Sequence, residues 1–153
     1  MSARTTQHEY TIKEAAALTG LPASTLRYYE SIGVIAPVSR GASSGHRVYD
    51  EDDLDQVMWV ACLAATGLSV AELKKYVANG QRGPSAAGEQ IEMLTNQQAR
   101  LEVEAEQLVL RQRYVALKID YWQAVGAGDE ARADLLSGQA RVLADELTRA
   151  KRE

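Results

Sequence analysis

Arginine and tyrosine residues gather in two short clusters near the start of this 153-residue chain. The first cluster is the segment 25–30 (TLRYYE), in which Arg27 and Tyr28 are adjacent, and the second is Arg47 and Tyr49 with one valine between them. Guanidinium and phenol groups donate hydrogen bonds to phosphate oxygens, and arginine also fits the paired acceptors on a guanine edge. The two clusters therefore indicate a surface suited to a phosphate backbone.

A helix-turn-helix is predicted to position the first cluster. Residues 12–18 form one helical stripe, and the following segment 19–22 (TGLP) has the glycine that such a sharp corner needs. A second helix is predicted over 24–32, with Ser24 as its N-cap and Gly33 as the residue that ends it.

The second helix has one apolar side and one polar side. Leu26, Tyr29 and Ile32 recur at three-residue steps, so we expect them to face the core. The polar residues left on the solvent-facing side are Thr25, Arg27 and Tyr28. The second helix of a DNA-binding helix-turn-helix enters the major groove. We expect Glu30 to orient a neighbouring arginine rather than to touch DNA.

A β-hairpin is predicted after the two helices. Residues 38–49 contain serines and glycines between two β-prone ends, which is typical of a hairpin with a flexible tip. This hairpin, called the wing below, carries the second cluster together with Arg40. A brief strand is also expected at 10–12, just ahead of the first helix.

Two further helices are predicted between the wing and a hinge. The first covers 54–65 and follows a run of carboxylates in 50–55 that complements the helix dipole. The second covers 70–78 behind the cap residue Ser69. Residues 80–88 contain a proline and three glycines, which favours a hinge.

Past the hinge, apolar residues alternate steps of three and four over more than four heptads, which is the pattern of a coiled-coil seam. A single helix cannot bury such a seam, so we predict a homodimer. Gln98 and Gln112 interrupt the seam, and polar seam residues usually fix the register. The apolar residues assigned to the dimer contact are Ile91, Leu94, Leu101, Leu108, Val115, Ile119 and Trp122.

Gly126 and Gly128 are predicted to end the long helix, and a last helix with another apolar stripe follows. We expect that helix either to fold back on the dimer or to cover an effector pocket, and both possibilities stay open. The predicted organisation is a flexible tail over 1–9, a DNA-binding head over 10–79, a hinge over 80–88, a dimerisation helix over 89–125 and a C-terminal helix over 126–153.

Bulk charge argues against a strongly basic nucleic-acid domain. The formal net charge is −4, and residues 1–80 contain seven Lys/Arg and nine Asp/Glu. Five of those acids lie within 50–55, however, so the rest of the head is net basic. We expect a small cationic surface made by four side chains, Lys13, Arg27, Arg40 and Arg47. No apolar run is long enough to span a bilayer, so we expect a cytoplasmic protein without membrane contact.

The stretch 10–67 resembles the DNA-binding head of MerR-family transcriptional regulators. The resemblance depends on the segment 25–30, Gly33, Pro37, the Arg-Val-Tyr of the wing and the Gly-Leu-Ser at 67–69. It implies a mainly α fold with a winged helix-turn-helix head, a short β-hairpin wing, a long coiled-coil dimerisation helix and a short C-terminal helix.

The resemblance also implies partners and residue roles. A homodimer would bind an inverted repeat in double-stranded promoter DNA at the bacterial nucleoid, alongside RNA polymerase, and distort the promoter spacer. Tyr28, Arg47 and Tyr49 would grip phosphates, while Thr25 and Arg27 would reach base edges. The full set of candidate DNA-binding residues is Lys13, Ser24, Thr25, Arg27, Tyr28, Arg40, Arg47 and Tyr49.

Cys62 has two interpretations. The segment 62–69 looks like the NmlR and AdhR branch of the family, whose cysteine is associated with sensing aldehydes and other electrophiles. Cys62 also falls on the predicted buried side of its helix, where apolar surroundings raise the pKa of a thiol and make it inert. A metal site is not expected, because residues 80–130 contain no cysteine or histidine, and no cofactor is expected.

Two other classes of function compete with a DNA-binding regulator. A coiled-coil scaffold whose head binds a protein partner is the main alternative, and loss of DNA binding on replacing Arg27 and Arg47 would discriminate against it. An enzyme is disfavoured, because His8 and His46 fall in a tail and in the wing tip and no glycine-rich phosphate loop is present.

Overall fold

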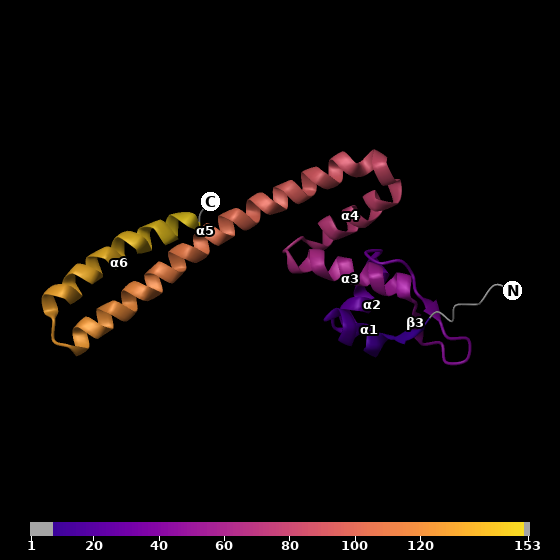
Figure 1. Cartoon of the computed structure of the whole chain (residues 1–153), viewed down its shortest axis with the longest axis horizontal. Helices are drawn as coiled ribbons and strands as arrows, with labels where there is room; N and C mark the ends of the chain where they lie inside the picture. Colours follow the sequence, from indigo (N-terminus) through magenta and orange to yellow (C-terminus); the bar gives the residue numbers. More distant parts are fainter. Residues whose placement is uncertain (1–7, 152–153) are drawn as a thin grey trace. The chain divides into compact units, whose positions relative to one another are not determined.

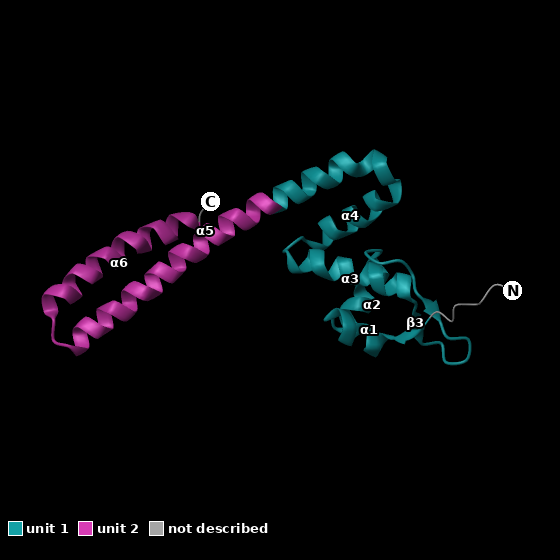
Figure 2. Cartoon of the chain, in the orientation of Figure 1, with its two compact units in different colours: residues 1–97 teal, residues 98–153 magenta. Residues whose placement is uncertain are grey.

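The computed structural model describes residues 8–151 and is mainly helical with one small sheet, as predicted (Figure 1). The elements in chain order are β1 (Tyr10–Thr11), α1 (Ile12–Thr19), α2 (Ala23–Ile32), β2 (Ser39–Arg40), β3 (Arg47–Tyr49), α3 (Glu51–Ala65), α4 (Val70–Arg82), the 3-10 helix η1 (Gly83–Ala86), α5 (Ala87–Gly126) and α6 (Glu130–Ala150). The chain divides into two compact units, residues 1–97 and 98–153, called the first and second unit (Figure 2). Most of the predicted flexible tail, residues 1–7, lies outside the described residues.

The helix-turn-helix forms as the sequence predicts, with one correction. Gly20 has φ 75° at the corner, and Gly33 has φ 81° after α2, so both take the left-handed conformation that glycine adopts at low cost. Helix α2 begins at Ala23 rather than at Ser24, and its N-cap is Pro22, which makes no side-chain cap hydrogen bond. The assignment of Ser24 as the cap was therefore wrong. Pro22, two residues earlier, has the φ of −59° that its ring imposes, and the helix begins directly after it.

The wing belongs to a three-stranded antiparallel sheet with the order β1-β3-β2. Tyr10 pairs with Tyr49 across β1 and β3, and Ser39 pairs with Val48 across β2 and β3. The short strand predicted at the start of the head is confirmed over two residues, and it attaches the wing to the N-terminus of α1.

The first unit has a single apolar core to which α1, α2, α3, α4 and the wing contribute. Leu26 and Tyr29 bury one side of α2 in it, as predicted. Asp50 caps α3: its side chain accepts from the Asp53 backbone N–H at 2.7 Å, and the Asp53 carboxylate accepts in return from the Asp50 backbone N–H at 3.1 Å. The predicted complement of acids to the helix dipole is thus present at the first turn of α3.

Residues 80–88, which the sequence predicts as a hinge, are helical in the structure. Helix α4 continues through Gly80 to Arg82, and only the turn η1 separates it from α5. Amide groups hold the two helices together at this point: Asn79 Nδ2 donates to Gln90 Oε1 at 3.2 Å, and Gln90 Nε2 donates to the Tyr76 carbonyl at 2.9 Å. These hydrogen bonds span 11 and 14 residues and connect the end of α4 to the start of α5.

In the second unit, α6 folds back along the α5 helix of its own chain (Figure 1). Ala124, Ala133 and Leu136 are buried between the two helices, with Leu117 and Tyr121 packed against them. Leu135, the residue before the buried Leu136, is 63% exposed. Within residues 8–151, no helix combines the length and apolar character needed to cross a membrane.

Candidate nucleic-acid interface

Four cationic side chains meet at a cavity of about 200 Å³ between the start of α1, α2 and the wing. They are the four residues that the sequence predicted as one cationic surface: Lys13, Arg27, Arg40 and Arg47. Thr11, Ile12 and His46 complete the lining, which contains no carboxylate. This cavity, called the cationic groove, therefore concentrates positive charge in a head whose total charge is not basic.

Glu30 fixes the position of the wing relative to α2. Its Oε2 lies 2.6 Å from Arg47 Nε, and the two side chains are only 13% and 20% exposed. Its Oε1 accepts a hydrogen bond from the Val38 backbone N–H at 3.4 Å. One carboxylate on α2 thus holds both ends of the wing, which confirms the prediction that Glu30 orients an arginine. Among the described contacts Arg47 uses only Nε, so its two terminal nitrogens remain available to a phosphate.

Hydrogen bonds within the wing hold its tip in place. The Gly41 N–H donates to the His46 carbonyl at 2.8 Å, and the Gly45 N–H donates to the Gly41 carbonyl at 2.9 Å. Arg40 Nη1 donates to the Gly45 carbonyl at 3.2 Å, so the base of the tip also orients the Arg40 guanidinium. The position of Arg40 in the groove is consequently set by one backbone carbonyl, that of Gly45, rather than by an acidic partner.

The outer face of α2 carries the predicted polar residues. Ser24, Arg27 and Tyr28 are exposed, with Tyr28 at 51%, and Thr25 is half-buried. These side chains come from the first turns of the helix, the part of a recognition helix that reaches base edges.

The side chain of Tyr49 is buried, whereas the resemblance implied that it contacts DNA. Its side chain is 0% exposed, and its hydroxyl is buried without a hydrogen-bond partner. Burial raises the pKa of the Tyr49 phenol above its ordinary value of 10.0, and the nearby Glu30 carboxylate adds to the rise. The expectation that Tyr49 grips a phosphate is therefore wrong, because its pairing with Tyr10 in the sheet turns the ring into the core.

The structure also corrects the position of Cys62. This cysteine is exposed rather than buried on α3, so burial no longer argues that its thiol is inert. Sequence reasoning also missed Thr11 as a groove residue. The spacing of Thr11 and Glu14 is that of a capping box, which the two residues form at the N-terminus of α1. This spacing could have shown where α1 begins, next to the groove residue Lys13.

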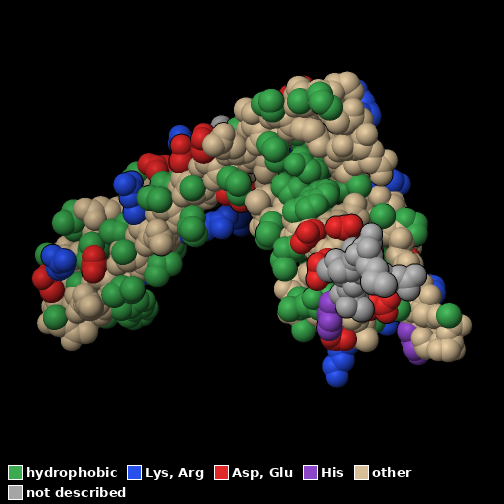
Figure 3. Space-filling model, turned by 45° about the vertical axis from the view of Figure 1, so that its right-hand side comes forward, with side chains coloured by type: hydrophobic (Ala, Val, Ile, Leu, Met, Phe, Trp, Pro, Cys, Tyr) green, Lys and Arg blue, Asp and Glu red, His purple; other side chains and the backbone are tan. Residues whose placement is uncertain are grey.

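All seven residues predicted to form the dimer contact are exposed in the single chain, each between 38% and 65%. Leu108, Val115, Ile119 and Trp122 of the second unit are each more than half exposed. Figure 3 shows hydrophobic side chains on the surface of this unit. An apolar row of this length on a helix is typical of a surface that packs against another protein segment.

Comparison with known proteins agrees with this architecture. Residues 10–80 match the family model of MerR HTH family regulatory proteins. The chain is 32% identical over 112 residues to the uncharacterized HTH-type transcriptional regulator YyaN of Bacillus subtilis (strain 168), covering 65% of this chain and 80% of YyaN. It is 37% identical over 90 residues to the HTH-type transcriptional regulator AdhR of the same strain, covering 59% of this chain and 64% of AdhR.

Among solved structures, the chain is similar to HiNmlR, a MerR family regulator lacking the sensor domain that was crystallised bound to promoter DNA. The two share 26% sequence identity with a TM-score of 0.70, over 82% of this chain and 96% of HiNmlR. The relatives and the fold are those of regulators rather than of enzymes. The chain belongs to the MerR family of helix-turn-helix transcriptional regulators.

Proposed function

We propose that this regulator acts as a homodimer on an inverted repeat in promoter DNA, with one first unit on each half-site. Helix α2 enters the major groove, where Thr25 and Arg27 contact base edges and Tyr28 contacts the backbone. Lys13, Arg40 and Arg47 bind phosphates next to that groove. The complex of HiNmlR with promoter DNA supports the choice of ligand.

The observation that carries the proposal is the cationic groove. Its four cations come from three separate elements, α1, α2 and the wing, and they converge without any acidic lining residue. Only Arg47 of the four has an ion-pair partner among residues 8–151, the Glu30 carboxylate, so gathering the other three cations beside it costs free energy in the unbound protein. A phosphate backbone at the groove would compensate for this repulsion.

The exposed apolar row on α5 supports the dimer. Two copies of this helix can bury the row against each other, whereas in the single chain it stays in contact with water. A dimer with a fixed separation between its heads can also bend or untwist the DNA between two half-sites. By this mechanism the protein would act with RNA polymerase at an over-long promoter spacer, in the bacterial cytoplasm at the nucleoid.

The test begins by selecting genomic fragments that the purified full chain retains. Binding of the best fragment is then measured by fluorescence anisotropy at several salt concentrations, for the wild type and for an Arg27→Ala/Lys13→Ala variant. Neither residue makes an ion pair in residues 8–151, so the variant should fold. Loss of each Lys13 phosphate contact should reduce the salt-dependence slope by about 0.9. Loss of the Arg27 base contacts as well should weaken binding at least about tenfold in total.

Lys75→Ala is the matched control, because Lys75 is an exposed cation of the same unit that does not line the cationic groove. It should leave both the affinity and the slope close to wild type. Equal effects of the control and the groove variant would overturn the assignment of the groove. Failure to enrich any genomic fragment would overturn the proposal as a whole.

A further inference from the structure

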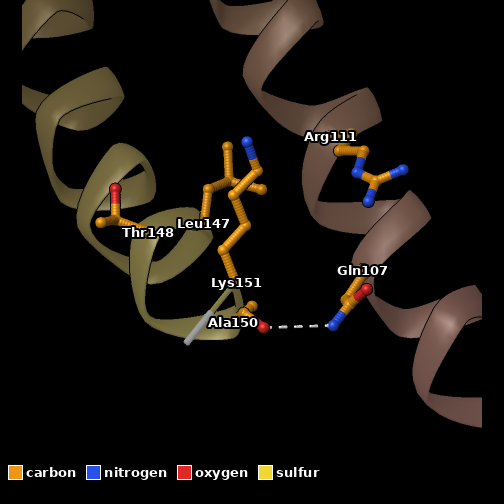
Figure 4. Close-up of a pocket in the computed structure, with 6 residues that line it drawn as sticks. All are labelled: Gln107, Arg111, Leu147, Thr148, Ala150 and Lys151. Carbon is orange, nitrogen blue, oxygen red and sulfur yellow. Dashed lines mark hydrogen bonds between the residues drawn. The ribbon is translucent and has the colours of Figure 1, made fainter. Parts of the chain in front are cut away.

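The second unit contains a cavity of about 530 Å³ between α5 and the last turns of α6. This volume lies in the range of cavities that bind small molecules. Figure 4 shows the residues that line it: Gln107, Arg111, Leu147, Thr148, Ala150 and Lys151. None of these residues belongs to the cationic groove or to the row assigned to the dimer contact.

The charge of the lining is entirely positive. Arg111 comes from α5 and Lys151 from the residue that follows α6, and no carboxylate is among the lining residues. Neither cation takes part in an ion pair within residues 8–151. Two cations that line one cavity repel each other. An anion bound between them would relieve that repulsion.

The other polar groups of the cavity are already engaged. Gln107 Nε2 donates to the Ala150 carbonyl at 3.3 Å, a bond drawn in Figure 4, and the Thr148 hydroxyl donates to the Ala144 carbonyl at 2.9 Å. The bond from Gln107 satisfies a carbonyl at the C-terminal end of α6, which weakens the negative end of the helix dipole beside the cavity. Hydrogen-bond donors for a ligand therefore come mainly from the two cations.

The remaining wall is apolar. Leu147 and Ala150 face the space between the helices, next to the aliphatic stem of Lys151 (Figure 4). An ion without an organic body would leave this wall in contact with water, whereas an apolar ring or chain would cover it. The lining thus combines two cations that can bind an anion with one apolar surface.

We propose that this cavity binds a small organic anion, whose carboxylate or phosphate group lies between Arg111 and Lys151 and whose apolar body lies against Leu147. The guanidinium of Arg111 presents a planar pair of donors that matches either anionic group. The Lys151 ammonium contributes a second, less directional charge.

The test uses sodium benzoate as the probe and benzamide as its neutral isostere, at constant ionic strength maintained with chloride. Thermal unfolding of the full chain is followed by circular dichroism. At a benzoate concentration roughly tenfold above its dissociation constant, the unfolding midpoint should rise by about 3 °C. Benzamide should produce no comparable rise, because it lacks the charge.

Four variants locate the bound probe. Arg111→Gln and Lys151→Gln should abolish the benzoate shift, and both remove exposed charges without disturbing the core. Arg113→Gln is the matched control on α5, since Arg113 is also exposed but does not line the cavity. Arg27→Gln controls for binding of the probe in the cationic groove. Both control variants should keep the shift.

Several results would overturn the proposal. These are a benzamide shift equal to that of benzoate, no shift with either compound, and a benzoate shift lost in Arg27→Gln but kept in Arg111→Gln. Inorganic phosphate is the last arm: a shift as large as that of benzoate would refute the role given to Leu147 and the organic body. A smaller shift of the unfolding midpoint with phosphate than with benzoate would support the roles given both to the two cations and to the apolar wall.

Discussion

The ion pair between Glu30 and Arg47 is expected to be a main source of stability for the first unit. The perturbation is a double-mutant cycle with Glu30→Gln, Arg47→Gln and the combination of both. Glutamine keeps the size of the glutamate side chain, but it removes the charge and replaces one of the two acceptor oxygens with an NH2 donor. The cycle isolates the energy of the pair from the separate effects of each substitution.

The structure sets the expected magnitude. The two side chains approach to 2.6 Å and are 20% and 13% exposed, so the pair is shielded from water without being fully buried. Charge-assisted hydrogen bonds contribute about 1.5–3 kcal/mol, and the residual exposure places this pair near the lower end. We expect each single substitution to lower the free energy of unfolding by about 2 kcal/mol, with a coupling energy of about 1.5 kcal/mol.

Urea unfolding followed by tryptophan fluorescence is the assay. The chain contains two tryptophans, Trp59 on α3 of the first unit and Trp122 on α5 of the second, so a Trp122→Phe background makes the signal specific for the first unit. The pair of Arg82 and Glu89 is the matched control, because its 3.1 Å contact is 50% and 45% exposed. An exposed pair of this kind should couple by less than about 1 kcal/mol. A Glu30–Arg47 coupling no larger than that of the control would refute the reasoning.

Three further substitutions test other features. Tyr49→Phe should leave DNA affinity unchanged and raise stability by about 1 kcal/mol, because it removes a buried hydroxyl without a partner. Since the folded pKa of Tyr49 lies above 10.0, the wild type should lose stability as the pH rises past 10.0 and Tyr49→Phe should lose less, as urea titrations across this range would detect. Gly33→Ala should destabilise the first unit by about 1 kcal/mol in the same assay, because its φ is 81°. Leu108→Ala should weaken the proposed dimer by more than about tenfold in sedimentation equilibrium, whereas Val142→Ala on the outer side of α6 should not.

Local sequence patterns were sufficient to predict the helix-turn-helix and most residues of the cationic groove. Gly20 and Gly33 lie where the chain needs a left-handed residue, and the three-residue spacing on α2 separates core from surface. The sequence predicted that Glu30 orients an arginine, and the structure identifies that arginine as Arg47. These features depend on interactions within one or two turns, or on charge, both of which the sequence shows directly.

Features that depend on which side of an element meets the core were harder to predict. Helix α3 has apolar residues on more than one side, so periodicity alone does not determine which side is buried. The core takes Val57 and Val60, while Met58 is 42% exposed and Cys62 is exposed with it. The orientation of Tyr49 likewise follows from its register against β1, a contact between residues far apart in the sequence. The contact between Asn79 and Gln90 was likewise not visible in the sequence, because the two residues meet only after the chain has turned.

The double role of the Glu30 carboxylate restricts how the DNA specificity of this regulator can be engineered. A transplant of the outer face of α2 from a relative would change the residues proposed to read bases, but the wing would keep its place only if position 30 retained an acid. Libraries aimed at new operators should therefore vary Ser24, Thr25, Arg27 and Tyr28 while keeping Glu30 and Arg47 constant. In variants that lose this carboxylate, a change in DNA binding could come either from altered base recognition or from a displaced wing, and the two causes could not be separated.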